Sequence, residues 1–179
     1  HVLATVDDTP PALIQEIIDL AVEGIVTDCK GPEDNAALYD LIGDIFGAME
    51  QAETLTETLH REISAARQSA AERPEKTVIY LTWKNPWITV ANDSYTASML
   101  ALVGLRILGG EGGQRYPAIE IDRALLAQAD LLLLGNTPFQ FEDEDIQDFQ
   151  LEHGIGSKPQ LAIIDGRSLS WPGKRVTEG

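Results

Sequence analysis

Three short apolar runs, separated from one another by longer helical segments, constrain the fold more than any other feature of the sequence. The runs are residues 77–81, 131–134 and 161–164. Runs of this length and composition are typical of strands that are buried on both faces of a sheet. Strands that alternate with helices form parallel sheets covered by those helices. Residues 76–179 are therefore predicted to form a three-layer, Rossmann-like α/β lobe with a parallel sheet.

The segments between these strands have the apolar spacing and the capping residues of helices. A first helix is predicted over residues 94–108, with Asp93 or Ser94 as its cap. Two further helices are predicted over residues 122–129 and 142–152, each directly before a strand.

The first 75 residues follow a different pattern. A strand is predicted over residues 2–6, followed by a helix that Thr9 can cap and that ends at Gly24. Residues 34–73 then carry an apolar stripe at helical spacing. They are predicted to be mainly one helix, about 60 Å long if unbroken. Glycine weakens a helix interior, so a kink is expected near Gly47.

Charge and composition exclude several classes of partner. The formal net charge is −16, and such a field repels phosphate backbones and anionic lipid. We therefore expect no nucleic-acid partner. No apolar stretch approaches the roughly 18 residues that a membrane span needs. Cys29 is the single cysteine, so neither an intrachain disulfide nor a cluster of thiolate ligands can form.

The sequence offers few groups for catalysis or metal binding. His1, His60 and His153 lack the i, i+4 spacing of a helical metal site. Neither a serine nucleophile elbow nor a glycine-rich dinucleotide fingerprint is present. Asp93 and Asp165 are better explained as a helix cap and a strand-end turn residue. The chain is therefore predicted not to be an enzyme and to hold neither a metal ion nor a cofactor.

Large aromatic side chains follow each of the three predicted strands. The carboxyl ends of parallel strands lie on one edge of a sheet, where open α/β sheets bind ligands. The alternative is that these rings are core residues. If Trp87 lies on a ligand wall, its replacement by alanine weakens binding by about tenfold without unfolding the protein. The predicted wall, including two polar anchors for an apolar cleft, consists of Trp83, Asn85, Trp87, Phe139, Phe141, Arg167 and Trp171.

Several motifs of the C-terminal half occur in an order that matches a known family. They are residues 83–90, Asp93-Ser94-Tyr95, Arg115-Tyr116-Pro117, residues 129–134, residues 137–141, Asp165-Gly166 and Ser170-Trp171-Pro172-Gly173. Together they resemble the C-terminal lobe of the helical-backbone substrate-binding proteins of ABC importers, the vitamin B12-binding-protein-like group.

The resemblance implies a division into a remnant of an N-terminal lobe (1–33), a backbone helix (34–75) and a C-terminal ligand-binding lobe (76–179). Most of the family's N-terminal lobe and its final helix have no counterpart in the sequence, so the chain resembles a fragment. Relatives carry cobalamin, heme, siderophores or metal ions between two lobes. The aromatic loops favour a bulky organic or metal-chelate ligand.

The resemblance also implies a location and a second partner. Such proteins are periplasmic or extracellular, with or without a lipid anchor, and they dock on ABC permease subunits through surface acids. Candidates by position are Glu142, Asp143 and Glu144, although acids at a helix start also favour the macrodipole. The alternatives are a small α/β enzyme or regulatory module with an aromatic pocket, and an interaction domain without a small ligand.

Overall fold

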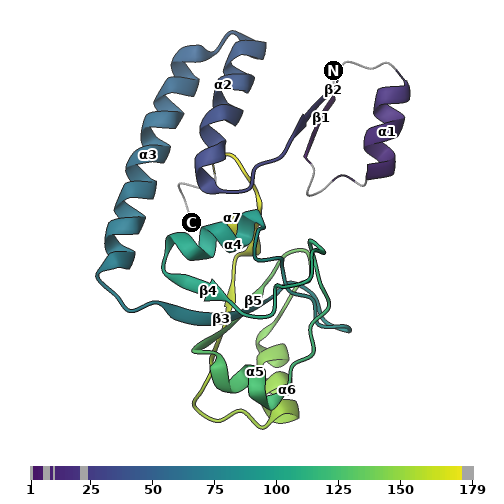
Figure 1. Cartoon of the computed structure of the whole chain (residues 1–179), viewed down its shortest axis with the longest axis vertical. Helices are drawn as coiled ribbons and strands as arrows, with labels where there is room; N and C mark the ends of the chain where they lie inside the picture. Colours follow the sequence, from purple (N-terminus) through teal and green to yellow (C-terminus); the bar gives the residue numbers. More distant parts are fainter. Residues whose placement is uncertain (1, 6–8, 10, 21–23, 175–179) are drawn as a thin grey trace.

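A sheet of four parallel strands forms the centre of the larger part of the molecule (Figure 1). The computed structural model describes residues 2–5, 9, 11–20 and 24–174. The order across the sheet is β4-β3-β5-β6, so β3 and β5 are the central pair. The pairing of β3 with β5 and of β5 with β6 is parallel, which confirms the prediction. The strands are β3 (Lys76–Leu81), β4 (Leu105–Ile107), β5 (Leu131–Gly135) and β6 (Gln160–Ile164).

Helices cover both faces of this sheet, because successive side chains of a strand point to opposite faces. Val78 and Tyr80 of β3 belong to a core shared with the helices of one face, and Ile79 and Leu81 belong to the core on the other. Figure 1 shows the two groups of helices on opposite sides of the strands. This arrangement confirms the three-layer α/β lobe. The first face carries α4 (Tyr95–Leu102) and α7 (Gly166–Ser170), and the second carries α5 (Arg123–Gln128) and α6 (Asp143–His153).

The predicted helix over residues 94–108 is too long. Helix α4 begins after Ser94, whose hydroxyl accepts a hydrogen bond from the N–H of Ala97, and it ends at residue 102. Gly104 has a left-handed φ of 79°, which other residues rarely adopt, and it turns the chain into the edge strand β4. The short strand was hidden because its apolar residues continue the spacing of the helix.

The prediction of one long helix over residues 34–73 is wrong. The structure has α2 (Asn35–Phe46) after a 3-10 turn η1 (Pro32–Asp34), and a separate α3 (Met49–Ala71). Gly47 caps α2 with a left-handed φ of 65°, and the chain reverses there into an antiparallel hairpin (Figure 1). A Cβ on Gly43 would lie 2.8 Å from the Cβ of Ala52, so glycine lets the two helices approach closely.

The N-terminal part forms a small β-α-β unit. Strands β1 (Val2–Thr5) and β2 (Gly24–Thr27) are parallel, and α1 (Pro11–Asp19) joins them. The sequence predicted the first strand and the helix, but it placed only the end of that helix, at Gly24, where β2 begins. The predicted last turn of that helix lies outside the described residues. The proposed division of the chain near residues 33 and 75 remains a proposal.

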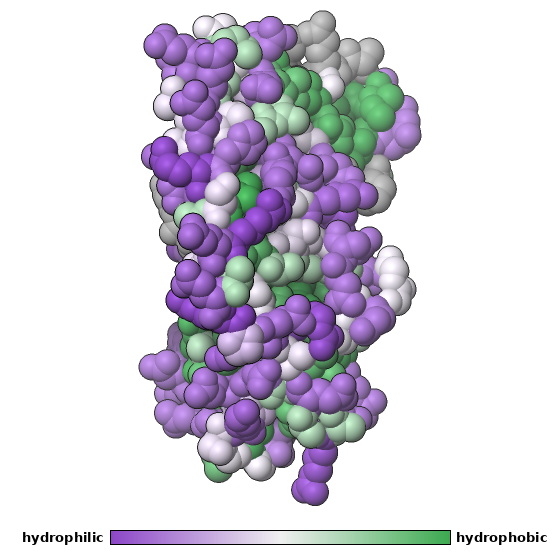
Figure 2. Space-filling model, turned by 60° about the vertical axis from the view of Figure 1, so that its left-hand side comes forward, coloured by the Kyte–Doolittle hydropathy of each residue, from purple (hydrophilic) through white to green (hydrophobic). Residues whose placement is uncertain are grey.

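The surface agrees with the strongly acidic composition. Figure 2 turns the side of α3 toward the reader, and this face is mainly hydrophilic. Among the described helices, none combines the length and the apolar character that crossing a membrane requires.

Candidate ligand-binding site

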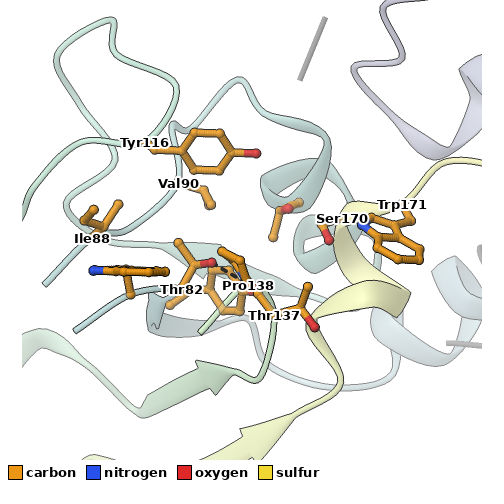
Figure 3. A pocket seen from close by; sticks show the side chains of 11 residues that line it. Thr82, Ile88, Val90, Tyr116, Thr137, Pro138, Ser170 and Trp171 are labelled. Atoms are coloured by element: carbon orange, nitrogen blue, oxygen red, sulfur yellow. Dashed lines mark hydrogen bonds between the residues drawn. The ribbon is translucent and has the colours of Figure 1, made fainter. Parts of the chain in front are cut away.

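A cavity of about 480 Å³ opens at the carboxyl ends of the central strands β3 and β5. In Figure 3, Tyr116 and Pro138 lie on opposite sides of it, and Trp171 lies beside Ser170 at one end. This is the edge at which open α/β sheets bind ligands. The cavity is lined by Tyr80, Thr82, Trp83, Ile88, Val90, Thr96, Tyr116, Thr137, Pro138, Ser170 and Trp171.

Tyr80 forms the floor of the cavity, although it belongs to the central strand β3 and is almost fully buried. Its ring lies over Gly135 of the neighbouring strand β5. A Cβ on Gly135 would overlap the Tyr80 hydroxyl and lie 2.7 Å from its Cζ, so this glycine makes room for the ring. Burial raises the pKa of Tyr80 far above its ordinary value, with smaller contributions from Tyr116 and Asp165. The phenol therefore stays neutral and can donate a hydrogen bond.

Hydroxyl groups are the main polar feature of the wall. The hydroxyl of Thr82 donates to the carbonyl of Thr137 over 3.1 Å, and that of Ser170 donates to the carbonyl of Gly166 over 2.8 Å. The first bond joins the loops that follow β3 and β5, and the second lies within α7. No side chain with a formal charge occurs among the described residues of the wall. The site is therefore suited to a ligand with aromatic or apolar faces and neutral polar groups.

Trp83 is held on this wall by the loop that follows β3. Its side chain is 40% exposed, and its ring meets Phe139 edge-on with centroids 5.5 Å apart. The next residue, Lys84, forms an ion pair with Asp145 of α6 at 2.6 Å. That hydrogen bond raises the pKa of Lys84. Burial raises the pKa of Asp145, but the bonds from Lys84 and from the N–H of Glu142 outweigh it, so the net shift is downward. Both groups therefore stay charged near neutral pH.

The structure does not bring all the predicted wall residues to the cavity. Trp83 and Trp171 line it, but Trp87 does not. Trp87 packs against the core on the α6 side, stacked on Phe141 at 6.4 Å and edge-on to Phe149 at 5.1 Å. Its contacts are those of a packing residue, which is the alternative that the sequence left open.

Four further candidates also lie off the wall, and one of them, Phe141, is buried in the core. Phe139 connects Trp83 to Phe141, with the two phenylalanine rings 4.6 Å apart, so it supports the wall from behind. Asn85 adopts a left-handed φ of 61° in the exposed loop. The Nε of Arg167 donates to Asp165 over 3.0 Å. None of these residues contributes to the cavity lining.

The sequence reasoning missed the tyrosines of the cavity. Tyr80 reads as an ordinary core residue within an apolar strand. A signal was available in the sequence, because side chains two residues apart on a strand point to the same face of the sheet. Tyr80 and Thr82 therefore lie on one face, next to the edge where the cavity opens. Tyr116 belongs to one of the motifs that carry the family resemblance, but it was not identified as a ligand residue.

Comparisons with known proteins agree with this architecture. No family model and no curated protein sequence matches the chain. Solved structures do match. The periplasmic vitamin B12 binding protein BtuF of Vibrio cholerae superposes with a TM-score of 0.81 at 15% identity, over 99% of this chain and 69% of that one. The chain has the vitamin B12-binding-protein fold. The fold that the sequence resemblance implies is thus confirmed.

Two heme-binding proteins share the vitamin B12-binding-protein fold to a similar degree. A periplasmic heme binding protein from Pseudomonas aeruginosa gives a TM-score of 0.79 at 16% identity, over 99% of this chain and 68% of that one. The periplasmic heme-binding protein RhuT from Roseiflexus sp. RS-1 gives 0.78 at 17% identity, over 99% and 71%. All three neighbours are binding proteins, and their names include different ligands. The fold alone therefore does not specify the ligand of this chain.

Proposed function

We propose that this chain is the ligand-binding part of a periplasmic or extracellular substrate-binding protein of an ABC importer. The observation that carries the proposal is the aromatic, hydroxyl-lined cavity at the carboxyl edge of the central strands. A cavity of about 480 Å³ is within the size range of small-molecule sites. The fold neighbours, which are named for vitamin B12 and heme, support a bulky organic or metal-chelate ligand.

Within this class, the cavity favours a ligand without net negative charge. A heme carries two carboxylates that call for cationic partners, and the described wall supplies none. A corrinoid such as cobalamin presents neutral amides, which pair well with the hydroxyls of Thr82, Tyr80 and Tyr116. The net charge of −16 also disfavours an anionic ligand. A bare metal ion fits less well, since the described residues contain no group of three or more His, Cys, Asp and Glu side chains placed to hold one.

The enzyme alternative has less support. Asp165, one of the two acids considered for catalysis, caps α7 by accepting a hydrogen bond from the N–H of Arg167 over 3.1 Å. Its carboxylate also pairs with the Arg167 side chain. These interactions explain the acid as a structural residue.

The ligand assignment can be tested by calorimetric titration of the chain with cyanocobalamin and with hemin as separate probes. We expect saturable binding of cyanocobalamin with one site per chain and weaker binding of hemin. Tighter binding of hemin would contradict the charge argument, and binding of neither probe would contradict the assignment to this ligand class.

The first prediction concerns Trp83, which combines exposure with a place on the wall. Replacement of Trp83 by alanine is expected to weaken cyanocobalamin binding by about tenfold, because it removes a large stacking surface. The Trp83→Phe variant keeps an aromatic face and should lose only part of that affinity. Titration calorimetry of both variants measures the change. Equal affinities of Trp83→Ala and the unmodified chain would show that the ligand does not contact this ring.

The first turn of α6 is the proposed contact for the permease. Glu142, Asp143 and Glu144 are all exposed there, and Glu142 is the N-cap of the helix. The three acids lie at the end of the helix that also receives the Lys84 ion pair. Complementary charges of this kind increase association rates and select partners.

The second prediction follows from this placement. The double variant Asp143→Lys/Glu144→Lys is expected to weaken docking on the permease at least tenfold and to leave ligand affinity unchanged. Glu53→Lys/Glu57→Lys, which reverses two exposed acids on α3, is the matched control and should leave docking unchanged. Binding to permease reconstituted in nanodiscs provides the measurement. Equal loss of docking in the control would point to a nonspecific charge effect rather than to a contact.

A further inference from the structure

Two side chains of α2 attach the segment that follows α7 to the helical hairpin, and the first of them is a buried asparagine. Asn35, the first residue of α2, is fully buried. Its Nδ2 donates hydrogen bonds to the carbonyl of Pro32 over 2.9 Å and to the hydroxyl of Tyr95 over 3.0 Å. Its Oδ1 accepts a hydrogen bond from the N–H of Gly173. The amide therefore connects α2, η1, α4 and the chain after α7 at a single point.

A second side chain of α2 completes the attachment. The hydroxyl of Tyr39 donates to the carbonyl of Gly173 over 3.0 Å. Both backbone polar groups of Gly173 are thus paired with side chains of α2. Gly173 has a φ of 115°, so a residue with a side chain would be strained there. Burial raises the pKa of Tyr95 to about 12, so the hydroxyl that receives the Asn35 amide stays neutral.

The attachment point lies two residues beyond Trp171, which forms one end of the cavity (Figure 3). On the other side, α7 holds the backbone of Trp171, because the backbone N–H of Trp171 donates to the carbonyl of Arg167 over 3.2 Å. The indole itself is 42% exposed, so core packing alone does not fix its place. The short backbone that carries the indole is held by hydrogen bonds on both sides, at α7 and at Gly173.

We propose that Asn35 and Tyr39 are positioning residues that set the place of Trp171 on the ligand wall. Neither side chain touches the cavity, and the inference rests on the proposed binding function. A ring that is already in place loses little freedom when a ligand stacks on it, so fixing Trp171 strengthens binding. A fully satisfied buried amide favours one arrangement of the segments that it joins.

The test uses fluorine NMR of the whole chain labelled with 5-fluorotryptophan. The chain has three tryptophans, and single Trp→Phe variants assign the three resonances. Tyr39→Phe keeps the buried ring and removes only the hydrogen bond to Gly173, and Asn35→Ala removes the amide. We expect the Trp171 resonance to shift and broaden in both variants, while those of Trp83 and Trp87 stay in place. Cyanocobalamin binding should weaken about fivefold in Tyr39→Phe, as for the loss of one ordering hydrogen bond.

Ile63→Val is the matched control. Ile63 belongs to the same buried cluster as Tyr39 but takes no part in these hydrogen bonds, so its shortening should leave all three resonances in place. An unchanged Trp171 resonance in folded Tyr39→Phe would overturn the proposal, as would equal shifts in the control. If Trp171 moves as expected while the unmodified chain binds neither cyanocobalamin nor hemin, the positioning role is supported and the proposed ligand class is wrong.

Discussion

Replacement of Trp87 by alanine is expected to lower the free energy of unfolding by about 3 kcal/mol, at the low end for large aromatic side chains, because Trp87 is half-buried against the core. Trp87 packs against Phe141 and Phe149, and alanine would leave a cavity between these rings. For a chain of this size, the melting temperature should fall by about 9 °C. This expectation replaces the one from the sequence, in which Trp87 contacts the ligand and its loss leaves stability unchanged.

Thermal and urea unfolding of Trp87→Ala and Trp83→Ala separates the two roles. Replacement of the exposed Trp83 is expected to lower stability much less than replacement of Trp87. It is the Trp83 variant that should lose ligand affinity. If Trp87→Ala keeps the melting temperature of the unmodified chain and loses affinity, the indole belongs to the ligand wall after all.

Replacement of Gly135 by alanine should affect both stability and binding. The added methyl group would overlap the Tyr80 hydroxyl, and Tyr80 is buried between strands and helices with little room to move. Overpacking of this kind costs about 2 kcal/mol. Because Tyr80 forms the cavity floor, its displacement should also weaken cyanocobalamin binding more than tenfold.

Gly156→Ala is the control for the glycine substitution itself. A Cβ on Gly156 would meet no atom within 4 Å, so this variant should unfold and bind like the unmodified chain. Chemical denaturation gives the stability of each variant and calorimetry its affinity. Unchanged binding by a folded Gly135→Ala variant would mean that the ligand does not reach the Tyr80 floor.

The parallel sheet could be predicted from the sequence because β3, β5 and β6 are continuous apolar runs with helices between them. The edge strand β4 could not, since it has three residues and directly follows α4. The hairpin was missed for a different reason. The apolar stripes on the facing sides of two packed helices have the same spacing as one stripe on a single long helix. Only Gly43 and Gly47 distinguish the two, and glycines at such positions also fit a kink.

The candidate site was predicted in outline only. The strand ends indicated the edge of the sheet at which the cavity opens, and Trp83 and Trp171 lie on the cavity wall. Sequence position alone could not separate Trp83 from Trp87, because both occupy one loop and their directions depend on how that loop folds. The left-handed Asn85 between them contributes to that difference. Asn35 and Tyr39 gave no signal, since their partner Gly173 is far away along the chain.

The link between Asn35 and Gly173 has a consequence for the order in which the site is assembled. The two residues are 138 positions apart, so the link closes a loop that contains the entire sheet. Contacts of such long range carry a large closure entropy and form late in folding. We therefore expect the end of the cavity that carries Trp171 to be completed last during folding. By the same reasoning, we expect this end of the cavity to open first when the hairpin loosens, while the central strands stay paired.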